Sequence, residues 1–236
     1  MIVANKNIVT CFLILLLAGC NQDMGEADLL SAFDFEGGSQ DWEGGISDFP
    51  VDYQGSANFS FDNSKVPNSI IAESSGLKIS ADNPHGDLFY FFKRRIDGLQ
   101  PGTSYKLDFE FLMYTQVLLD SNAFSSNEIY LKIGAADHAP VLEQITRSDS
   151  IEYMALNVDK GKSNSDSGQD LINIGSIKEF TGKMPETISG NSFDNEIIVT
   201  ADDNGRIWLV IGVDSGLKGQ LTFGMDALTV FYKEIN

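Results

Sequence analysis

The sequence predicts an all-β protein whose single domain is an antiparallel two-sheet β-sandwich. Apolar and polar residues alternate with period two along most of the chain after residue 30. Short clusters of Gly, Asn, Asp and Ser separate the alternating stretches, as turns do between strands. Sustained helical periodicity with capping residues is absent from the sequence. About ten to thirteen strands fit into residues 31–236, and that number suits a sandwich.

The first twenty residues, MIVANKNIVTCFLILLLAGC, have the pattern of a secretory signal peptide. Lys6 is their only charge, and the apolar stretch from Ile8 to Leu17 is shorter than the roughly 20 residues that span a bilayer. The ending Leu17-Ala18-Gly19-Cys20 resembles the lipobox of bacterial lipoproteins. This resemblance implies cleavage before Cys20 and its acylation with palmitate-like chains, which tether a protein to a lipid bilayer. The alternative is an ordinary signal peptide with an incidental cysteine.

Residues 21–30 are predicted to be a polar tether between the lipid and the folded domain. Asn21, rather than an aspartate, follows the cysteine. By resemblance to enterobacterial sorting rules, this favours the outer membrane. The predicted organisation is therefore a lipoprotein signal peptide over 1–20, a tether over 21–30 and one domain over 31–236.

Composition excludes several classes of function. Cys11 would leave with the signal peptide and Cys20 would carry lipid, so disulfides, thiol catalysis and cysteine metal sites are not expected. The formal net charge of −18 argues against nucleic acid, because phosphate binding needs a basic patch. The same charge permits weak accumulation of cations such as Ca²⁺.

Individual strands can be read from the alternation. "YKLDFEFLMY" places Tyr105, Leu107, Phe109, Phe111 and Met113 on one face, and Lys106, Asp108 and Glu110 on the other. "EIYLKIG" repeats the pattern. "EIIVTADDNGRIWLVIGVDSG" predicts a hairpin around Asn204-Gly205, and "QLTFGMDALTVFYKE" predicts one long strand or two joined at Gly224. "PVLEQITRS" and "KMPETISG" could each hold at most a turn or two of helix.

Three segments resemble carbohydrate-binding modules with a jelly-roll fold. "FDFEGGSQDWEGG" is similar to their first strand, "DLFYFFKRRIDGLQPGTSYKLDFEF" to their central strand pair, and "FGMDALTVF" to their closing strand. The chain also resembles a family of uncharacterised bacterial envelope proteins, in "NVDKGKSNSDSGQDLINIG" and "WLVIGVDSGLKG". The resemblance implies a jelly-roll-like sandwich in the cell envelope and no established activity.

Catalysis is not favoured. The two histidines, His85 and His138, fall in turns, and neither a nucleophile elbow nor an H-E-x-x-H zinc motif is present. The carboxylate pairs Asp34/Glu36 and Asp108/Glu110 lack the spacing of sandwich-fold glycosidases, and the second pair is more simply the wet face of an outer strand. Whether the chain is an enzyme stays open, with a binding role preferred.

Glycan binding needs aromatic platforms beside polar groups. The run Phe89-Tyr90-Phe91-Phe92 puts aromatic rings on both faces of one strand, and only one face can point into a sandwich core. Either a loop or a ligand covers the other face. The candidate ligand-binding residues are therefore Phe89, Tyr90, Phe91, Phe92, Arg94 and Trp42, with Tyr53 and Tyr114 as further exposed aromatics. Trp208 is expected in or near the core.

Two sets of carboxylates could hold a structural Ca²⁺. The run "NVDKGKSNSDSGQD" supplies Asp159, Asp166 and Asp170, although Lys160 and Lys162 interrupt any EF-hand order. The other set is Glu36 and Asp226, since calcium in jelly rolls often bridges the first and last strands. A solvated loop with Asx-turns is the alternative for residues 157–170.

The sequence thus favours a lipid-anchored envelope protein that binds glycan or another extracellular polymer without catalysis. The first alternative is a structural or assembly protein that binds another envelope protein through a sheet face. A glycoside-active enzyme is the second. No nucleic-acid partner is expected.

Overall fold

The computed structural model describes residues 29–67, 73–119, 129–147, 150–177 and 186–235. Cys20, the predicted signal peptide and all but the last two residues of the predicted tether lie outside these ranges. Within them are fifteen strands and one short 3-10 helix, η1, Val51–Ser56. The described residues contain no helix long and apolar enough to cross a membrane.

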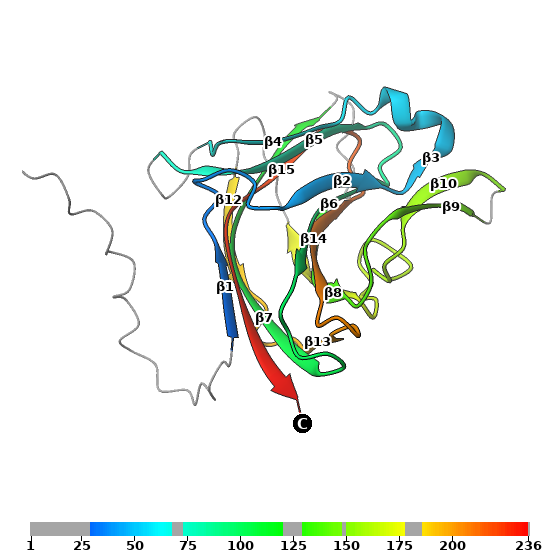
Figure 1. Ribbon diagram of the computed structural model, residues 1–236. Coiled ribbons are helices and arrows are strands. Elements are labelled where there is room, and N and C mark those ends of the chain that lie inside the picture. The colour runs from blue at the N-terminus through cyan, green and yellow to red at the C-terminus, as the bar shows by residue number, and fades with distance from the viewer. Residues whose placement is uncertain (1–28, 68–72, 120–128, 148–149, 178–185, 236) are drawn as a thin grey trace, which may run out of the picture.

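Two antiparallel sheets form the sandwich, which confirms the predicted fold class (Figure 1). In the larger sheet, called sheet A, the long central strands β7 and β15 pair along their whole length. β12 and β13 pair with the other edge of β7, while β1 and β5 pair with the other edge of β15, and β4 follows β5. The bounds are β1 Leu29–Phe33, β4 Ser60–Lys65, β5 Ser75–Asn83, β7 Ser104–Leu119, β12 Glu186–Asn191, β13 Ile197–Thr200 and β15 Gly219–Ile235.

The second sheet, sheet B, has the order β11-β8-β14-β6-β2. Its inward side chains meet those of sheet A in one continuous core. The predicted inward sets of β7, Tyr105 to Met113, and of β8, Ile129 to Ile133, all lie in this core, so the alternation predicts their orientation correctly. The bounds are β2 Glu43–Ser47, β6 Phe89–Ile96, β8 Ile129–Ala136, β11 Leu171–Ile177 and β14 Ile207–Ser215.

A third, small sheet covers the outer face of sheet B. It contains β3 (Phe49–Pro50), β9 (Leu142–Thr146) and β10 (Glu152–Leu156). Leu156 and Leu142 pack with Phe89, Phe91 and Val210 in a second apolar cluster. In the segments "PVLEQITRS" and "KMPETISG", where a helical turn was allowed, the described residues contain β9 and most of β12 instead. β9 pairs with the next strand, β10, and β12 pairs with the distant β7, so strand pairing overrides local propensity in both segments.

The predicted hairpin and the predicted final strand are both present. Gly205 turns the chain between β13 and β14 with a φ of +70°, which favours glycine. The final segment is one strand, β15, whose pairing with β7 is irregular between Met225 and Ala227. This irregularity lies two residues beyond Gly224, where a break was one expectation.

Candidate functional site

The four consecutive aromatic residues of β6 are buried on both faces of sheet B. Tyr90 and Phe92 point into the core, and the Tyr90 hydroxyl donates to the carbonyl oxygen of Ala81. Phe89 and Phe91 lie beneath the third sheet. The exposed fractions are between 0% and 4%. These residues therefore form no exposed platform for a glycan. The outer face of β6, for which the sequence allowed either a loop or a ligand as cover, is covered by the third sheet.

Of two other predicted ligand-binding residues, Trp42 is buried and Arg94 is partly buried. Trp42 is 2% exposed and meets the ring of Phe33 edge-on, with 5.4 Å between centroids. The guanidinium of Arg94 stacks over the same ring at 4.6 Å. Tyr114, expected to be exposed, is 1% exposed. Trp208, expected in or near the core, is partly exposed on the outer face of sheet B, 5.6 Å from the Lys93 ammonium.

The polar run 157–170 folds around a cation that the chain itself supplies. Lys132, from the middle of β8, has no exposed surface. Its ammonium donates to the carbonyl oxygens of Lys160 at 2.6 Å, Asp166 at 3.0 Å and Ser163 at 3.1 Å. The carboxylate of Asp214 lies 3.5 Å away. Burial lowers the pKa of Lys132, and the negative charge of Asp214 opposes this effect.

The carboxylates of this loop bind its own backbone. Asp159 accepts hydrogen bonds from the amides of Gly161 and Gln169, which lower its pKa. Asp166 accepts from the amide of Ser163, and Asp170 from that of Asp159. The contact of Asp159 with Gly161, two residues on, is an Asx-turn, which is the alternative that the sequence left open. The other three contacts join more distant parts of the loop. The ion-binding alternative for Asp159, Asp166 and Asp170 stays a prediction.

The other predicted calcium ligands lie near the same stretch of β5. Glu36 accepts a hydrogen bond from the amide of Ser75. Asp226 is 1% exposed, and its Cα lies beside Gly76. Among the described residues, no three His, Cys, Asp or Glu side chains are grouped as a metal site would require.

An ion-pair network ties the third sheet and the loop to sheet B. Lys160 lies 2.5 Å from Asp214 and 3.2 Å from Asp48. Arg147, in the turn after β9, pairs with Asp48 at 3.1 Å and with Asp87 at 3.5 Å. With Lys132 the network holds three cations and three carboxylates. The Arg147–Asp87 pair is about one-third exposed, whereas the other four side chains are at most 17% exposed. The charges balance, so the network leaves little net charge for a ligand.

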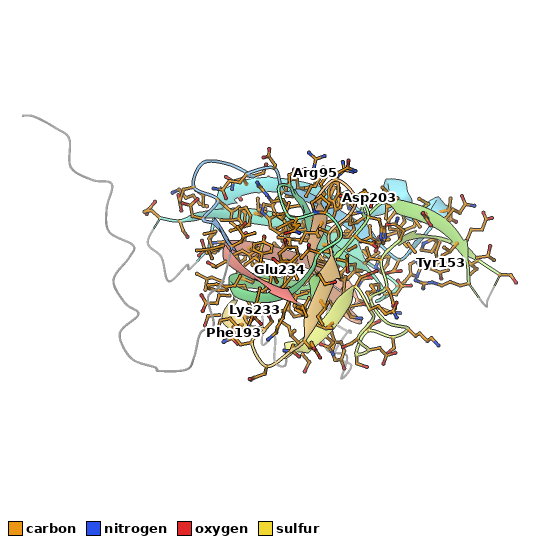
Figure 2. The ribbon with its side chains drawn as sticks, turned by 60° about the horizontal axis from the view of Figure 1, so that its bottom comes forward. Arg95, Tyr153, Phe193, Asp203, Lys233 and Glu234 are labelled. Carbon is orange, nitrogen blue, oxygen red and sulfur yellow. The ribbon has the colours of Figure 1, made fainter. Side chains whose placement is uncertain are left out.

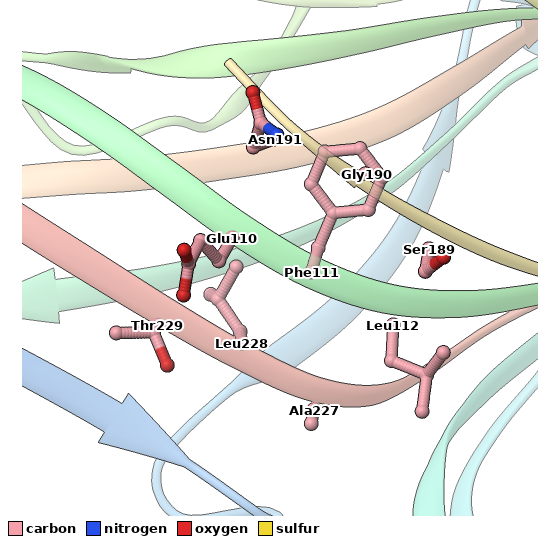
Figure 3. A pocket seen from close by; sticks show the side chains of 9 residues that line it. All are labelled: Glu110, Phe111, Leu112, Ser189, Gly190, Asn191, Ala227, Leu228 and Thr229. Carbon is pink, nitrogen blue, oxygen red and sulfur yellow. The ribbon is translucent and has the colours of Figure 1, made fainter. Parts of the chain in front are cut away.

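A shallow groove of about 440 Å³ crosses the outer face of sheet A (Figure 3). Its lining comes from β12, β7 and β15, whose residues face each other in register. Asn191 lies opposite Glu110, which lies opposite Thr229; one row along, Ser189, Leu112 and Ala227 are aligned in the same way. The remaining lining residues are Phe111, Gly190 and Leu228. Phe111 and Leu228 belong to the core, so Leu112 and Ala227 supply the apolar floor, beside carboxylate, amide and hydroxyl groups.

An aromatic pair lies next to the groove. Phe231 follows Thr229 on the outward face of β15, and Phe193 follows Asn191 in the turn after β12. The two rings meet edge-to-face with 6.1 Å between centroids, and Phe193 is 42% exposed. An aromatic surface beside polar side chains on a sheet face is what a glycan site requires. The sequence reasoning missed both residues, although the outward position of Phe231 follows from its alternation with Val230 and Tyr232.

Glu110 is the single carboxylate in the groove lining. Glycoside hydrolysis needs two carboxyl groups facing each other across the bond. Glu110 is exposed and Asp108 is partly exposed on the outward face of β7, as expected of a wet face, but β7 is a central strand of sheet A and not an outer one. The geometry therefore suits binding better than hydrolysis.

Comparison with known proteins gives distant likenesses only. No protein-family model matches the chain, and no curated protein matches it. Among solved structures, a putative sugar binding protein from Bacteroides thetaiotaomicron is 11% identical over 81% of this chain and 88% of its own, with a TM-score of 0.39. The CBM22-1 xylan-binding domain of Paenibacillus barcinonensis Xyn10C is 8% identical over 87% and 95%, with a TM-score of 0.36.

A bacteriophage CBA120 tailspike domain is matched over 83% of this chain but only 20% of its own length, with 11% identity and a TM-score of 0.32. Similarities at these TM-scores and identities indicate neither a ligand nor a family for this chain. The assignment as a two-sheet sandwich rests on the strand pairing itself.

Proposed function

We propose that this chain is a lipid-anchored protein of the bacterial cell envelope that binds a glycan without catalysis. The observation that carries the proposal is the groove on sheet A, where Glu110, Asn191, Ser189 and Thr229 flank an apolar floor beside the Phe193–Phe231 pair. Sugars present both hydroxyl groups and apolar ring faces, so such a surface can meet both. The open groove suits a segment of a polymer better than a deeply enclosed small molecule.

Glycan-array binding with matched variants tests the groove. Glu110→Gln keeps the shape but removes the charge, and we expect it to weaken binding about 10-fold or more, because hydrogen bonds to charged groups contribute roughly 1.5–3 kcal/mol. Glu152→Gln, an exposed carboxylate on β10, is the control and should bind as the unaltered protein does. Equal binding by both variants, or no glycan bound by the unaltered protein, would reject the proposal.

The lipid anchor is a separate part of the proposal. Its support is the lipobox-like ending at Cys20 and the polar residues that follow it. We expect Cys20→Ser to move the protein from the membrane fraction to the soluble fraction. The same fractionation, with inner and outer membranes separated, tests the outer-membrane location that Asn21 favours.

The assembly hypothesis competes for the same face of sheet A. Leu30 and Ile198, which are 59% and 45% exposed, extend the surface beyond the groove with apolar side chains that a protein partner could cover. A partner protein that binds the unaltered chain, loses affinity with Glu110→Gln and is not displaced by glycan would favour this second function.

A structural Ca²⁺ is kept as a proposal for Glu36 and Asp226. Its support is that the two candidate ligands lie at consecutive residues of β5: Glu36 contacts Ser75, and Asp226 lies beside Gly76. A saturating ligand that binds only the folded state stabilises it by about 2.7 kcal/mol at 100 times its dissociation constant. We expect Ca²⁺, compared with EDTA, to raise the melting temperature, and Asp226→Asn to abolish that rise. Equal melting temperatures of the unaltered protein in Ca²⁺ and in EDTA would exclude the ion.

A further inference from the structure

Five exposed apolar side chains gather at one end of sheet A. These are half of the ten large hydrophobic residues that are exposed in the described part of the chain, with exposed fractions from 39% to 59%. We call them the apolar strip: Leu29, Leu30, Phe193, Ile198 and Ile235. Single exposed apolar residues need no explanation, but a contiguous set marks an interaction surface.

The strand register brings the outward members of the strip together, while Leu29, opposite the buried Tyr232, lies at the same end on the other face of β1. Leu30 on β1 pairs with Phe231 on β15, whose ring contacts Phe193. Ile198 on β13 pairs with Lys106 on β7, and Lys106 with Lys233 on β15. β1 begins and β15 ends at this same end of the molecule (Figure 1). Figure 2 shows Phe193, Lys233 and Glu234 together on one side and Tyr153 of β10 on the other.

The strip also lies where the described chain begins. Leu29 is its first residue, and Cys20 precedes it by nine positions. Nine residues span at most about 32 Å when fully extended and about 17 Å on average as a flexible chain. An acylated Cys20 would therefore hold the strip within a few tens of ångströms of the bilayer surface.

We propose that the apolar strip docks on the bilayer to which Cys20 is anchored, and thereby fixes the orientation of the sandwich on the membrane. This inference rests on the lipid anchor of the proposed function. The end of sheet A that carries the strip then faces the lipid, so the groove on sheet A and the third sheet on sheet B open to opposite sides above the lipid headgroups.

The charges around the strip are compatible with a lipid surface. The whole chain carries −18, which repels anionic headgroups. Around the strip, Lys106 and Lys233 offset two of the four carboxylates Asp108, Asp194, Glu196 and Glu234, which suits zwitterionic headgroups better than anionic ones. The Lys106 ammonium lies 3.5 Å from the Asp108 carboxylate. Lysines beside apolar residues can also extend their charged ends to the headgroups while their stems stay in contact with lipid.

The test uses the full-length, acylated protein in phosphatidylcholine vesicles. With Cys11 removed and Cys20 acylated, an introduced cysteine is the single free thiol, so a spin label reports one position. Phe193→Cys and Leu30→Cys place it in the strip, and Ile145→Cys is the matched control. Ile145 is an exposed apolar residue, 41% exposed, that pairs with Tyr153 in the third sheet.

We expect the two strip labels to lose collisions with a water-soluble nickel reagent and to gain collisions with oxygen when the protein is anchored, with no change at position 145. Two strip labels that stay as accessible to nickel as the control, in protein that is anchored, would overturn docking and leave the anchor intact. If the protein does not associate with membranes, both docking and anchor fail. If the strip labels are shielded from both reagents and show dipolar broadening from a second label nearby, the strip contacts a second copy of the chain. That result would reject docking on the bilayer.

Discussion

At the scale of single residues, Lys132 decides the character of the loop 157–170. The loop contains the oxygens expected of an ion site, and three backbone carbonyl oxygens do converge on a positive charge. That charge is an ammonium group on a strand 25 residues or more away in sequence. The sequence could not reveal this, because Lys132 falls in an ordinary position of the alternating stretch "EIYLKIG".

Replacing Lys132 should therefore destabilise the fold strongly. Lys132→Met keeps the length of the side chain but leaves three carbonyl oxygens and part of the Asp214 charge without their donor. Breaking a buried ion pair from one side costs about 3–5 kcal/mol, which urea unfolding would measure. Lys162→Met, at an exposed lysine of the same loop, should change stability by no more than about 0.5 kcal/mol. Equal stability of the two variants would show that the ammonium does not hold the loop.

His138 predicts a pH dependence with a definite sign. Its Nδ1 lies 2.8 Å from the carboxylate of Asp137 and its Nε2 lies 2.8 Å from the carbonyl oxygen of Asn157, and these contacts raise its pKa. The protonated form is thus favoured in the folded protein. Its contribution is complete below the unfolded pKa of about 6.5 and is lost as the pH rises through the higher folded pKa.

The measurement is the melting temperature between pH 5 and 8.5 for the unaltered protein and for His138→Gln. The variant removes this one titration and leaves the others, so the difference between the two curves isolates it. We expect the melting temperature of the unaltered protein to exceed that of His138→Gln most at pH 5, and this difference to shrink toward pH 8.5. A difference that grows with pH would contradict the assignment.

At the scale of elements, the sequence predicts which side chains of a strand point into the core better than it predicts which element packs on a given strand. The alternation in β7 and β8 identifies the inward residues, because one face of each strand must be apolar. The run Phe89 to Phe92 correctly indicates a strand covered on both faces, but the covering element, the third sheet, comes from residues 49–50 and 142–156. The groove depends likewise on the register of β12, β7 and β15, which no local pattern specifies.

The β13–β14 hairpin offers a test of one such local signal. Gly205 has a φ of +70°, and a Cβ there would lie 2.1 Å from the carbonyl oxygen of Leu99. Gly98 has a φ of +87°, but a Cβ there would meet no atom within 4 Å. Gly98→Ala should thus carry only the left-handed backbone cost of about 1–2 kcal/mol, while Gly205→Ala adds a steric clash. Urea denaturation should rank Gly205→Ala as clearly less stable, and the reverse order would contradict the turn geometry.

At the scale of the whole molecule, the excess of acidic residues sets the response to salt. The net charge of −18 makes the compact state repel itself, whereas the enclosed network around Lys132 and Lys160 is balanced and shielded from solvent. Raising the ionic strength from 0.01 to 0.15 M shortens the screening length from about 30 to about 8 Å, so it weakens the long-range repulsion far more than the buried pairs. The melting temperature should therefore rise with NaCl.

Charge variants separate this effect from general effects of salt. Glu152→Lys and Asp203→Lys, both at exposed positions, together change the net charge by four units, from −18 to −14. Because repulsion is then smaller, the double variant should melt higher in 0.01 M NaCl and gain less from added salt. A control with Glu152→Asp and Asp203→Glu keeps the charge and should follow the unaltered protein. If all three proteins gained equally from salt, self-repulsion would not limit the stability of this sandwich.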